Sequence, residues 1–521
     1  MEEAGARKIL TPRLIVLLVI LAAGSVVALY LWLVYVPYMR EFMDDESPIY
    51  EELNLDGDGE VQTPFLIRTA EDLAEIAEKV NNGSTYREKH FLLMNDIDMT
   101  GYLSPGSAGY NDGAGWKPIG SFDGNRGFGG VFDGAGYTVS GLWLNRPSEA
   151  YGGLFGSLQN ASVFRLNVST EKIVARHGIG ALAGNMTGGI IQSCIVIAEE
   201  FIIDDEFNGA LGILVGWAEG ENIIDNSFAR GSVNIIASNG RFFHIGGLVG
   251  VVYDGVVSNS YADADITIRT QDATINSGGL IGLLRENTVV INCHSTGSVI
   301  IQETLISNMG GLIGRSVGEN IEIRNSSSSA DVSGTDYLGG FIGVLNEGTE
   351  ISGSFSTGNV TCADEIFCYC LLGGFVGYSS GTIRSSFAAG DVTMNSCSFS
   401  GGFVGYQTTG IITDCYSTGD VISGVGFFYY GGFAGGQSEE SRIENCYSTG
   451  KAKINGFIPS YNGIVKNCYY DSESSDAWSF LDGVTGKPTA EMQNIITFEG
   501  WDFTNIWFMP ENDYPKLRII Q

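Results

Sequence analysis

Short runs of alternating apolar and polar residues fill most of this chain and predict β-strands rather than helices. Gly, Asn, Asp and Ser, which favour turns, separate the runs. The pattern repeats around the phrase Gly-Gly-Phe-Val-Gly at 373–377 and 401–405, whose closing glycine has counterparts 28 to 34 residues apart. The ten closing glycines are Gly156, Gly184, Gly216, Gly250, Gly282, Gly314, Gly343, Gly377, Gly405 and Gly435. The chain is therefore a repeat protein built from short strands.

Each repeat places a large apolar residue two positions before its closing glycine, Leu in the first six copies and Phe in the last four. A second phrase, with the form Asn-Cys-Tyr-Ser-Thr-Gly at 445–450, follows in each repeat. Earlier copies place an asparagine at steps of 33 residues, at Asn226, Asn259, Asn292 and Asn325. Asn adopts left-handed turn conformations at low cost, and stacked amides bond along a fibre axis. Both columns are therefore expected to be structural.

The repeat length favours a β-solenoid over a propeller. From Gly156 to Gly435 the mean spacing is 31 residues, whereas a propeller blade usually needs about 40 and blades rarely exceed about eight. Each solenoid turn would add about 4.8 Å along the axis.

An apolar segment near the N-terminus predicts a membrane anchor. Residues 14–36 contain 23 positions without a charge, which at about 1.5 Å per residue suffice to span an apolar layer of about 30 Å. Arg7, Lys8 and Arg13 precede the segment and acidic residues follow it, which predicts an N-terminus inside and the rest outside. A cleaved signal peptide is the alternative, but its apolar region normally has about 7 to 15 residues. We therefore expect an uncleaved signal anchor in a single-pass cell-membrane protein.

An acidic stretch follows the expected anchor and predicts an exposed linker. It contains Asn54, Asp56 and Asp58, which match the opening of a calcium-binding loop. Phe65 stands where such a loop carries its bidentate glutamate. A calcium site on these three residues is the alternative to a plain linker.

One helix is predicted in the remainder of the chain. Thr69 is a candidate N-cap, Leu73, Ile76 and Val80 form an apolar face, and Gly83 ends the helix. At the start of a solenoid, such a helix covers the open strand edge of the first turn.

The motifs after this helix carry a resemblance to a known family. They are Asn-Asp-Ile-Asp-Met at 95–99, Trp-Lys-Pro-Ile-Gly at 116–120 and the Gly-rich run at 128–142. Together with the repeats, they resemble the GLUG family over about residues 62–521, with Val139 where the family usually carries Ile. The resemblance implies a surface-exposed right-handed β-helix, a module of surface proteins, adhesins and some immunoglobulin A proteases. It supplies no catalytic residues.

The expected fold class is therefore all-β: a right-handed parallel β-helix (β-solenoid) of about ten rungs, with an N-terminal capping helix and a preceding transmembrane helix. The expected domains are a cytoplasmic tail at 1–13, the transmembrane anchor at 14–37, an acidic linker at 38–61, the N-terminal cap and first rungs at 62–145, the repeat β-helix at 146–470 and a C-terminal cap at 471–521.

Charge and cysteine positions narrow the function. Sixty acidic against 28 basic residues give a net charge of −32, so nucleic acid is not an expected partner.

Five cysteines share a repeat slot with serines and are expected to be small buried residues: Cys194, Cys293, Cys415, Cys446 and Cys468. Others lie in loops, where Cys397 can form a disulfide with Cys368 or Cys370 in an oxidising exterior.

The sequence contains no recognisable catalytic motif. Its four histidines lie far apart without metal-ligand spacing, and no His-Glu-x-x-His is present, so protease activity is not supported. The enzymatic alternative is a polysaccharide lyase or hydrolase, which needs paired carboxylates or basic groups. Aspartates occur mainly at turns, and the basic residues show no cluster in sequence. We expect no catalysis and no cofactor apart from the possible calcium ion.

Aromatic residues in the loops before successive Gly-Gly pairs are the candidate binding residues. They are Phe367, Tyr369, Phe399, Phe427, Phe428 and Tyr429. If these side chains project, they form a strip that stacks on sugar rings or on a partner protein. The alternative is that they seal the core at a corner of the solenoid. The expected function is adhesion or cell-envelope structure, with a cell-surface carbohydrate or an envelope protein as the partner.

Overall fold

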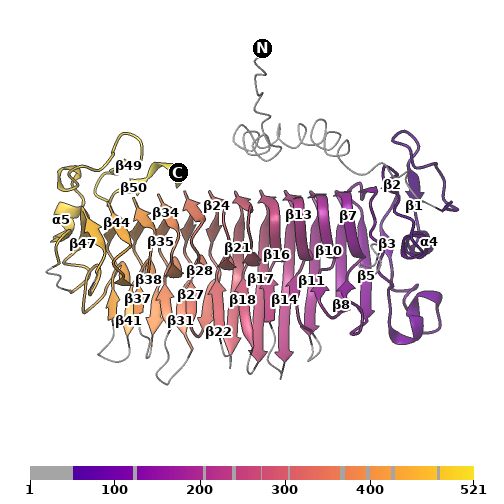
Figure 1. Cartoon of the computed structure of the whole chain (residues 1–521), viewed down its shortest axis with the longest axis horizontal. Coiled ribbons are helices and arrows are strands. Elements are labelled where there is room, and N and C mark those ends of the chain that lie inside the picture. Colours follow the sequence, from indigo (N-terminus) through magenta and orange to yellow (C-terminus); the bar gives the residue numbers. More distant parts are fainter. Residues whose placement is uncertain are drawn as a thin grey trace, which may run out of the picture. The chain divides into compact units, whose positions relative to one another are not determined.

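The computed structural model describes residues 51–120, 126–203, 207–237, 242–270, 273–302, 306–363, 370–394, 399–423, 429–460, 462–477 and 481–520. They belong to one compact unit, Ile49–Gln521. Its strands coil into a solenoid in which each strand pairs in parallel with its counterpart one turn away (Figure 1). Three sheets run along the solenoid axis.

Sheet 1 has ten short strands: β6 (Tyr151–Gly152), β9 (Gly178–Ile179), β12 (Ala210–Gly212), β15 (Phe242–Gly246), β18 (Thr274–Gly278), β22 (Ile306–Gly310), β27 (Tyr337–Gly339), β32 (Leu371–Gly373), β37 (Phe399–Gly401) and β42 (Tyr429–Gly431). Sheet 2 comprises β1 (Phe65–Ile67), β2 (His90–Leu93), β4 (Val131–Asp133), β7 (Phe155–Phe164), β10 (Ala183–Gln192), β13 (Val215–Asp225), β16 (Val249–Ser258), β19 (Ile281–Leu284), β20 (Val289–Ile291), β23 (Ile313–Ser316), β24 (Ile321–Arg324), β28 (Ile342–Leu345), β29 (Thr349–Ser352), β33 (Val376–Ser379), β34 (Thr382–Arg384), β38 (Val404–Gln407), β39 (Ile411–Thr413), β43 (Ala434–Gln437), β44 (Arg442–Glu444) and β46 (Ile464–Lys466). Sheet 3 comprises β3 (Ile97–Asp98), β5 (Thr138–Asn145), β8 (Asn167–Val174), β11 (Ile195–Ile203), β14 (Phe228–Ala237), β17 (Tyr261–Thr270), β21 (His294–Gln302), β25 (Ser327–Ser328), β26 (Asp331–Gly334), β30 (Phe355–Ser356), β31 (Val360–Cys362), β35 (Phe387–Ala388), β36 (Val392–Met394), β40 (Tyr416–Ser417), β41 (Val421–Ser423), β45 (Tyr447–Ser448), β47 (Cys468–Asp471) and β48 (Val484–Lys487).

The large apolar residue of each repeat lies in the core, as expected. Leu312 is fully buried, and so are the phenylalanines that occupy its slot in later turns. Phe375 stacks on Phe403 with ring centroids 4.8 Å apart, and Phe403 stacks on Phe433 at 4.9 Å. These spacings match the distance between paired strands, because identical side chains lie on top of one another in successive turns.

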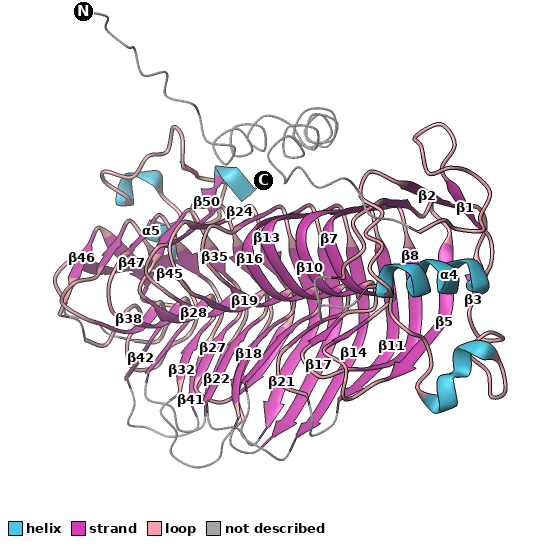
Figure 2. Cartoon of the chain, turned by 45° about the vertical axis from the view of Figure 1, so that its right-hand side comes forward, coloured by secondary structure: helices cyan, strands magenta, loops and turns pink. Residues whose placement is uncertain are grey.

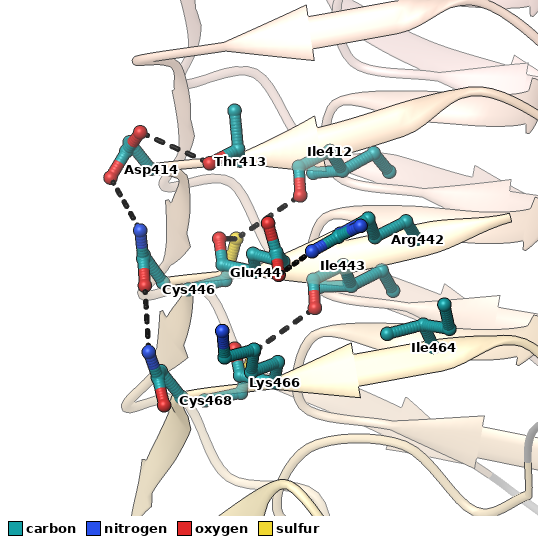
Figure 3. A network of polar contacts seen from close by, with 12 residues as sticks. Ile412, Thr413, Asp414, Arg442, Ile443, Glu444, Cys446, Ile464, Lys466 and Cys468 are labelled. Atoms are coloured by element: carbon teal, nitrogen blue, oxygen red, sulfur yellow. Dashed lines mark hydrogen bonds and ion pairs between the residues drawn. The ribbon is translucent and has the colours of Figure 1, made fainter. Parts of the chain in front are cut away.

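The asparagine column forms the turns between sheets 2 and 3. Asn259 and Asn292 have φ values of 49° and 54°, in the left-handed region. The Nδ2 atom of Asn292 donates to Oδ1 of Asn259 at 3.1 Å, one turn away. The same axial bonding recurs near the C-terminal end, where Asp414 accepts from the asparagine of the next turn (Figure 3). This column is therefore structural.

The cysteines of the repeat slot are buried beside these turns. Cys446 and Cys468 are buried, and Cys446 Sγ donates to the Glu444 carbonyl at 3.1 Å (Figure 3). Serines in the same slot use their hydroxyls in the same way, since Ser227 Oγ donates to the Asp225 carbonyl at 2.9 Å. The interpretation of the slot as small buried residues is confirmed.

The predicted helix is present as α4 (Ala70–Asn81). Its N-cap is Thr69, which forms a capping box with Asp72, and its buried face includes Leu73, Ile76 and Val80. Figure 2 places α4 at the N-terminal end of the solenoid. Residues 51–61, expected in the linker, are packed onto this end, since the Tyr86 hydroxyl donates to the Glu51 carbonyl at 2.8 Å.

The expected fold class needs two corrections. Ten closing glycines mark ten strands of sheet 1, and ten strands from β6 to β42 enclose nine complete turns rather than ten. No helix within the described ranges is long and apolar enough to cross a membrane. The longest, α4, has 12 residues and is about 18 Å long, against about 30 Å of apolar layer. The expected transmembrane helix at 14–37 lies outside the described residues.

The C-terminal segment runs back along the side of the solenoid. It contains α5 (Thr489–Met492) and the antiparallel pair β49 (Trp507–Phe508) and β50 (Lys516–Leu517). Its Trp501 and Trp507 pack with Tyr416 and Tyr447 on the outer face of sheet 3. The Tyr447 hydroxyl donates to the Pro515 carbonyl at 2.7 Å. This segment therefore covers the outer face of the last turns.

Candidate binding surface

The closing glycine of each repeat creates a sharp corner between sheets 1 and 2. A Cβ atom on Gly250 would lie 2.6 Å from the backbone nitrogen of Leu211 in β12, and one on Gly282 would lie 2.5 Å from that of Ile245 in β15. Contacts this short exclude any side chain. Only glycine therefore allows the outer face of sheet 2 to approach the backbone of sheet 1, and the motif glycine is explained by this approach.

Two columns of outward side chains line the corner. The first, on sheet 1, is Ala210, His244, Asn276, Asn308, Tyr337, Leu371, Phe399 and Tyr429. The second, on sheet 2, is Trp217, Val251, Leu283, Arg315, Val344, Tyr378, Tyr406 and Gly436. Ala210, Val251 and Leu283 form an apolar cluster that is separate from the main core. We call the surface made by these two columns and by Arg285, which directly follows β19 (Ile281–Leu284), the axial corner.

The C-terminal half of the axial corner is aromatic. Tyr337 and Tyr378 meet edge to face across the corner, with ring centroids 5.9 Å apart. Phe399 contacts Tyr406 across the corner at 4.8 Å and stacks on Tyr429 of the next turn at 5.2 Å. The exposed fraction of Tyr429 is 54%. Five rings thus follow the solenoid axis on the outside of the wall.

Two of the predicted binding residues lie in this aromatic half. Phe399 is half-buried between its ring partners, whereas Tyr429 is exposed, and a binding role for either residue stays a prediction. Phe367, Tyr369, Phe427 and Phe428 lie outside the described residues. Sequence reasoning missed Tyr378 and Tyr406, which follow the closing glycines Gly377 and Gly405 directly. A tyrosine directly after the closing glycine in two successive repeats was the sequence signal for these two residues.

The N-terminal half of the axial corner, which we call its polar half, combines the apolar cluster of Ala210, Val251 and Leu283 with polar and basic side chains. Asn308 Nδ2 donates to Asn276 Oδ1 at 2.7 Å, and Asn276 Nδ2 lies 2.9 Å from His244 Nδ1. Burial, followed by the nearby charges of Arg285 and Arg315, lowers the pKa of His244 to about 4. The His244 ring is therefore neutral at ordinary pH.

Arg285 and Arg315 are one repeat apart in sequence and lie in adjacent turns of the solenoid. Arg315 follows Leu283 in the sheet 2 column, and Arg285 extends from the end of β19. The Arg285 guanidinium lies over the Tyr253 ring, 5.1 Å from its centroid. The prediction that basic residues do not cluster was made along the sequence. It did not consider residues separated by one turn.

The candidate calcium ligands have protein partners. Asp56 forms an ion pair with Arg68 at 3.0 Å, and Asp58 accepts hydrogen bonds from the Thr63 hydroxyl and the Glu60 backbone. The Thr63 hydrogen bond is the main cause of a lowered pKa at Asp58. Asn54 donates its backbone N–H to Glu75. Among the described residues, no group of three His, Cys, Asp or Glu residues is arranged to hold a metal ion, and calcium at this loop stays a prediction.

The disulfide candidates are only partly described. Cys368 and Cys397 lie outside the described residues. Cys370 is buried, and its Sγ atom lies 3.4 Å from Sγ of Cys362. The pairing of Cys397 with Cys368 or Cys370 stays a prediction.

Comparisons with known proteins agree with the repeat analysis. Residues 243–267, 400–422 and 428–455 match the family described as the GLUG motif. A provisionally named Gly-rich membrane protein of Evansella cellulosilytica is 38% identical over 144 residues, which are 27% of this chain and 15% of that protein. Halomucin of Haloquadratum walsbyi is 31% identical over 134 residues, which are 25% of this chain and 1% of halomucin. The matches therefore span only a small part of both relatives.

A solved structure from Bacteroides ovatus, provisionally assigned as an immunoglobulin A1 protease, aligns over 89% of this chain and 95% of its own length. The sequence identity is 16% and the TM-score is 0.32. The expected resemblance is confirmed by the motif matches, and the chain is a β-solenoid whose turns carry GLUG motifs.

Proposed function

We propose that this chain is a cell-surface β-solenoid protein that binds an extended carbohydrate along the axial corner without cleaving it. The names of its relatives, a Gly-rich membrane protein and halomucin, support a surface location. The net charge of −32 would keep such a protein soluble and would limit non-specific association.

The observation that carries the proposal is the aromatic half of the axial corner. Its rings lie outside the core, so the core does not require them, and each turn from β27 to β42 adds at least one ring to the line of the corner. Rings in such a line offer apolar edges and, at Tyr429, an open face to the C–H surfaces of sugars. Backbone groups of the neighbouring strands are paired within their sheets, so a peptide ligand could not add itself as a further strand here.

The proposal is tested with the full chain against a panel of neutral and acidic polysaccharides, scoring retention and release of new sugar ends together. Y429A and Y406A are expected to weaken retention. Y137A is the matched control, because Tyr137 is a 38% exposed tyrosine that is not in either column of the axial corner. Time-dependent release of new sugar ends would show that the protein is a lyase or hydrolase rather than a binding protein. Equal retention by all three variants would refute the assignment to the corner.

A further inference from the structure

The polar half of the axial corner contains hydrogen-bond donors that lack acceptors. The Nε atom of the Arg315 side chain is buried and has no hydrogen-bond partner among the residues that the structure describes. Arg285 has one acidic neighbour, Glu286, at 3.9 Å, and 43% of its side chain is exposed. Unpaired buried donors carry a desolvation penalty, so two arginines with so few partners indicate a position for an external acceptor.

The asparagine chain beside these arginines orients a further donor. Because Asn276 Oδ1 accepts from Asn308, the Asn276 amide nitrogen faces His244 Nδ1 and donates to it. His244 Nδ1 is then an acceptor, and the neutral ring carries its proton on Nε2. His244 therefore carries its N–H on Nε2, and it stands next to Asn276 in the sheet 1 column.

Basic and acidic side chains both lie at this part of the corner. The chain carries a net charge of −32, yet this part of the corner presents two guanidinium groups. Acidic residues beside them include Glu286, next to Arg285, and Glu219, which is in register with Tyr253. Neither forms a close ion pair with Arg315.

We propose that the polar half of the axial corner, made by His244, Asn276, Arg285 and Arg315, binds the carboxylate groups of an acidic polysaccharide. This inference rests on the proposed function and names its ligand class. Guanidinium groups match carboxylates in a planar, two-bond geometry. The polar half spans about three turns, or roughly 10 Å between its ends at the strand spacing, and continues into the aromatic half. One polymer chain can therefore place acidic groups on the arginines and sugar rings on the tyrosines.

The test measures binding of the full chain to polygalacturonate, with neutral galactan and dextran sulfate as the comparison polymers. Physiological salt is used, since a Debye length of about 8 Å screens the distant acidic residues but not direct contacts. R315Q is expected to lower affinity for polygalacturonate about ten- to a hundredfold, the value of one lost charged hydrogen-bond pair. R230Q is the matched control. Arg230 lies on sheet 3 and pairs with Asp263, and its replacement by Gln removes the same charge as R315Q. It should change affinity less than about twofold.

The outcomes separate this inference from the proposed function. Two results refute an acidic ligand but leave the carbohydrate proposal intact. In the first, galactan binds more strongly than polygalacturonate. In the second, R315Q lowers the affinities for galactan and polygalacturonate by the same factor. Equal binding of dextran sulfate overturns the choice of carboxylate. Retention of no polysaccharide overturns both proposals. R285Q is measured in parallel, so that a folding defect in R315Q, detected by its melting temperature, does not decide the result.

Discussion

Replacing Phe403 by alanine is expected to destabilise the solenoid strongly, because its ring is fully buried and stacks on a ring in each adjacent turn. Phe→Ala in a core typically lowers the free energy of unfolding by about 3–5 kcal/mol. Two aromatic contacts account for about 1–3 kcal/mol of this loss. Leucine occupies the same slot in earlier turns, for example at Leu312. F403L should therefore lower the free energy of unfolding only by the contribution of the two ring contacts.

The assay is urea unfolding followed by circular dichroism, with limited proteolysis to detect local opening of the later turns. F228A is the control, since Phe228 is half-buried on the outer face of sheet 3 and stacks on one ring, Tyr261. We expect the order of destabilisation to be F403A, then F403L, then F228A. Equal stability of F403A and F403L, or a loss below about 1 kcal/mol for F403A, would refute a stabilising ring column.

Three further predictions concern pH, the C-terminal segment and the thiols. The pKa of His244 is lowered to about 4 in the folded chain against about 6.5 unfolded, so only the unfolded state binds the proton between these values. Stability should thus fall by at most about 3 kcal/mol as pH drops from 6.5 to 4. Urea titrations at both pH values should show a smaller fall for H244N, and an unchanged fall would contradict this. Y447F removes the buried hydrogen bond from the Tyr447 hydroxyl to the Pro515 carbonyl. It should lower the free energy of unfolding by about 1 kcal/mol and speed proteolysis of the C-terminal segment. An unchanged cleavage rate would show that this bond does not hold the segment. Burial raises the pKa of Cys194 to about 12, so its thiol should resist alkylation until urea unfolds the chain, whereas rapid labelling of the folded protein would show that the turn opens.

The parts of the fold that were predictable from sequence are those set by one repeat at a time. Leu312 and Phe403 share a slot two residues before a glycine, and Asn292 stands at a turn that favours positive φ. Each of these roles depends on local geometry and recurs at every turn. The helix α4 was also predicted from a local pattern, whereas the expected ten rungs were one too many, because ten strands of sheet 1 enclose nine turns.

The axial corner was only partly predictable, because it depends on how the chain bends at each closing glycine. Phe399 was identified as a candidate, but its partner Tyr406 lies on the other side of the bend, and the backbone geometry decides that the two rings meet. The position of Arg285 and Arg315 in adjacent turns is found only when residues one repeat apart are compared. The C-terminal segment has no repeat, so nothing in its sequence specifies that Trp507 packs beside Tyr416.

Oxidative footprinting of the full chain, with and without the polysaccharide that it retains most strongly, tests the central claim most directly. The measurement reports loss of side-chain accessibility at individual aromatic residues. The account predicts protection of Tyr378, Tyr406 and Tyr429 in the axial corner, with Phe228 and Tyr261 on sheet 3 unchanged. Protection of the sheet 3 residues with no change at the three tyrosines would contradict it.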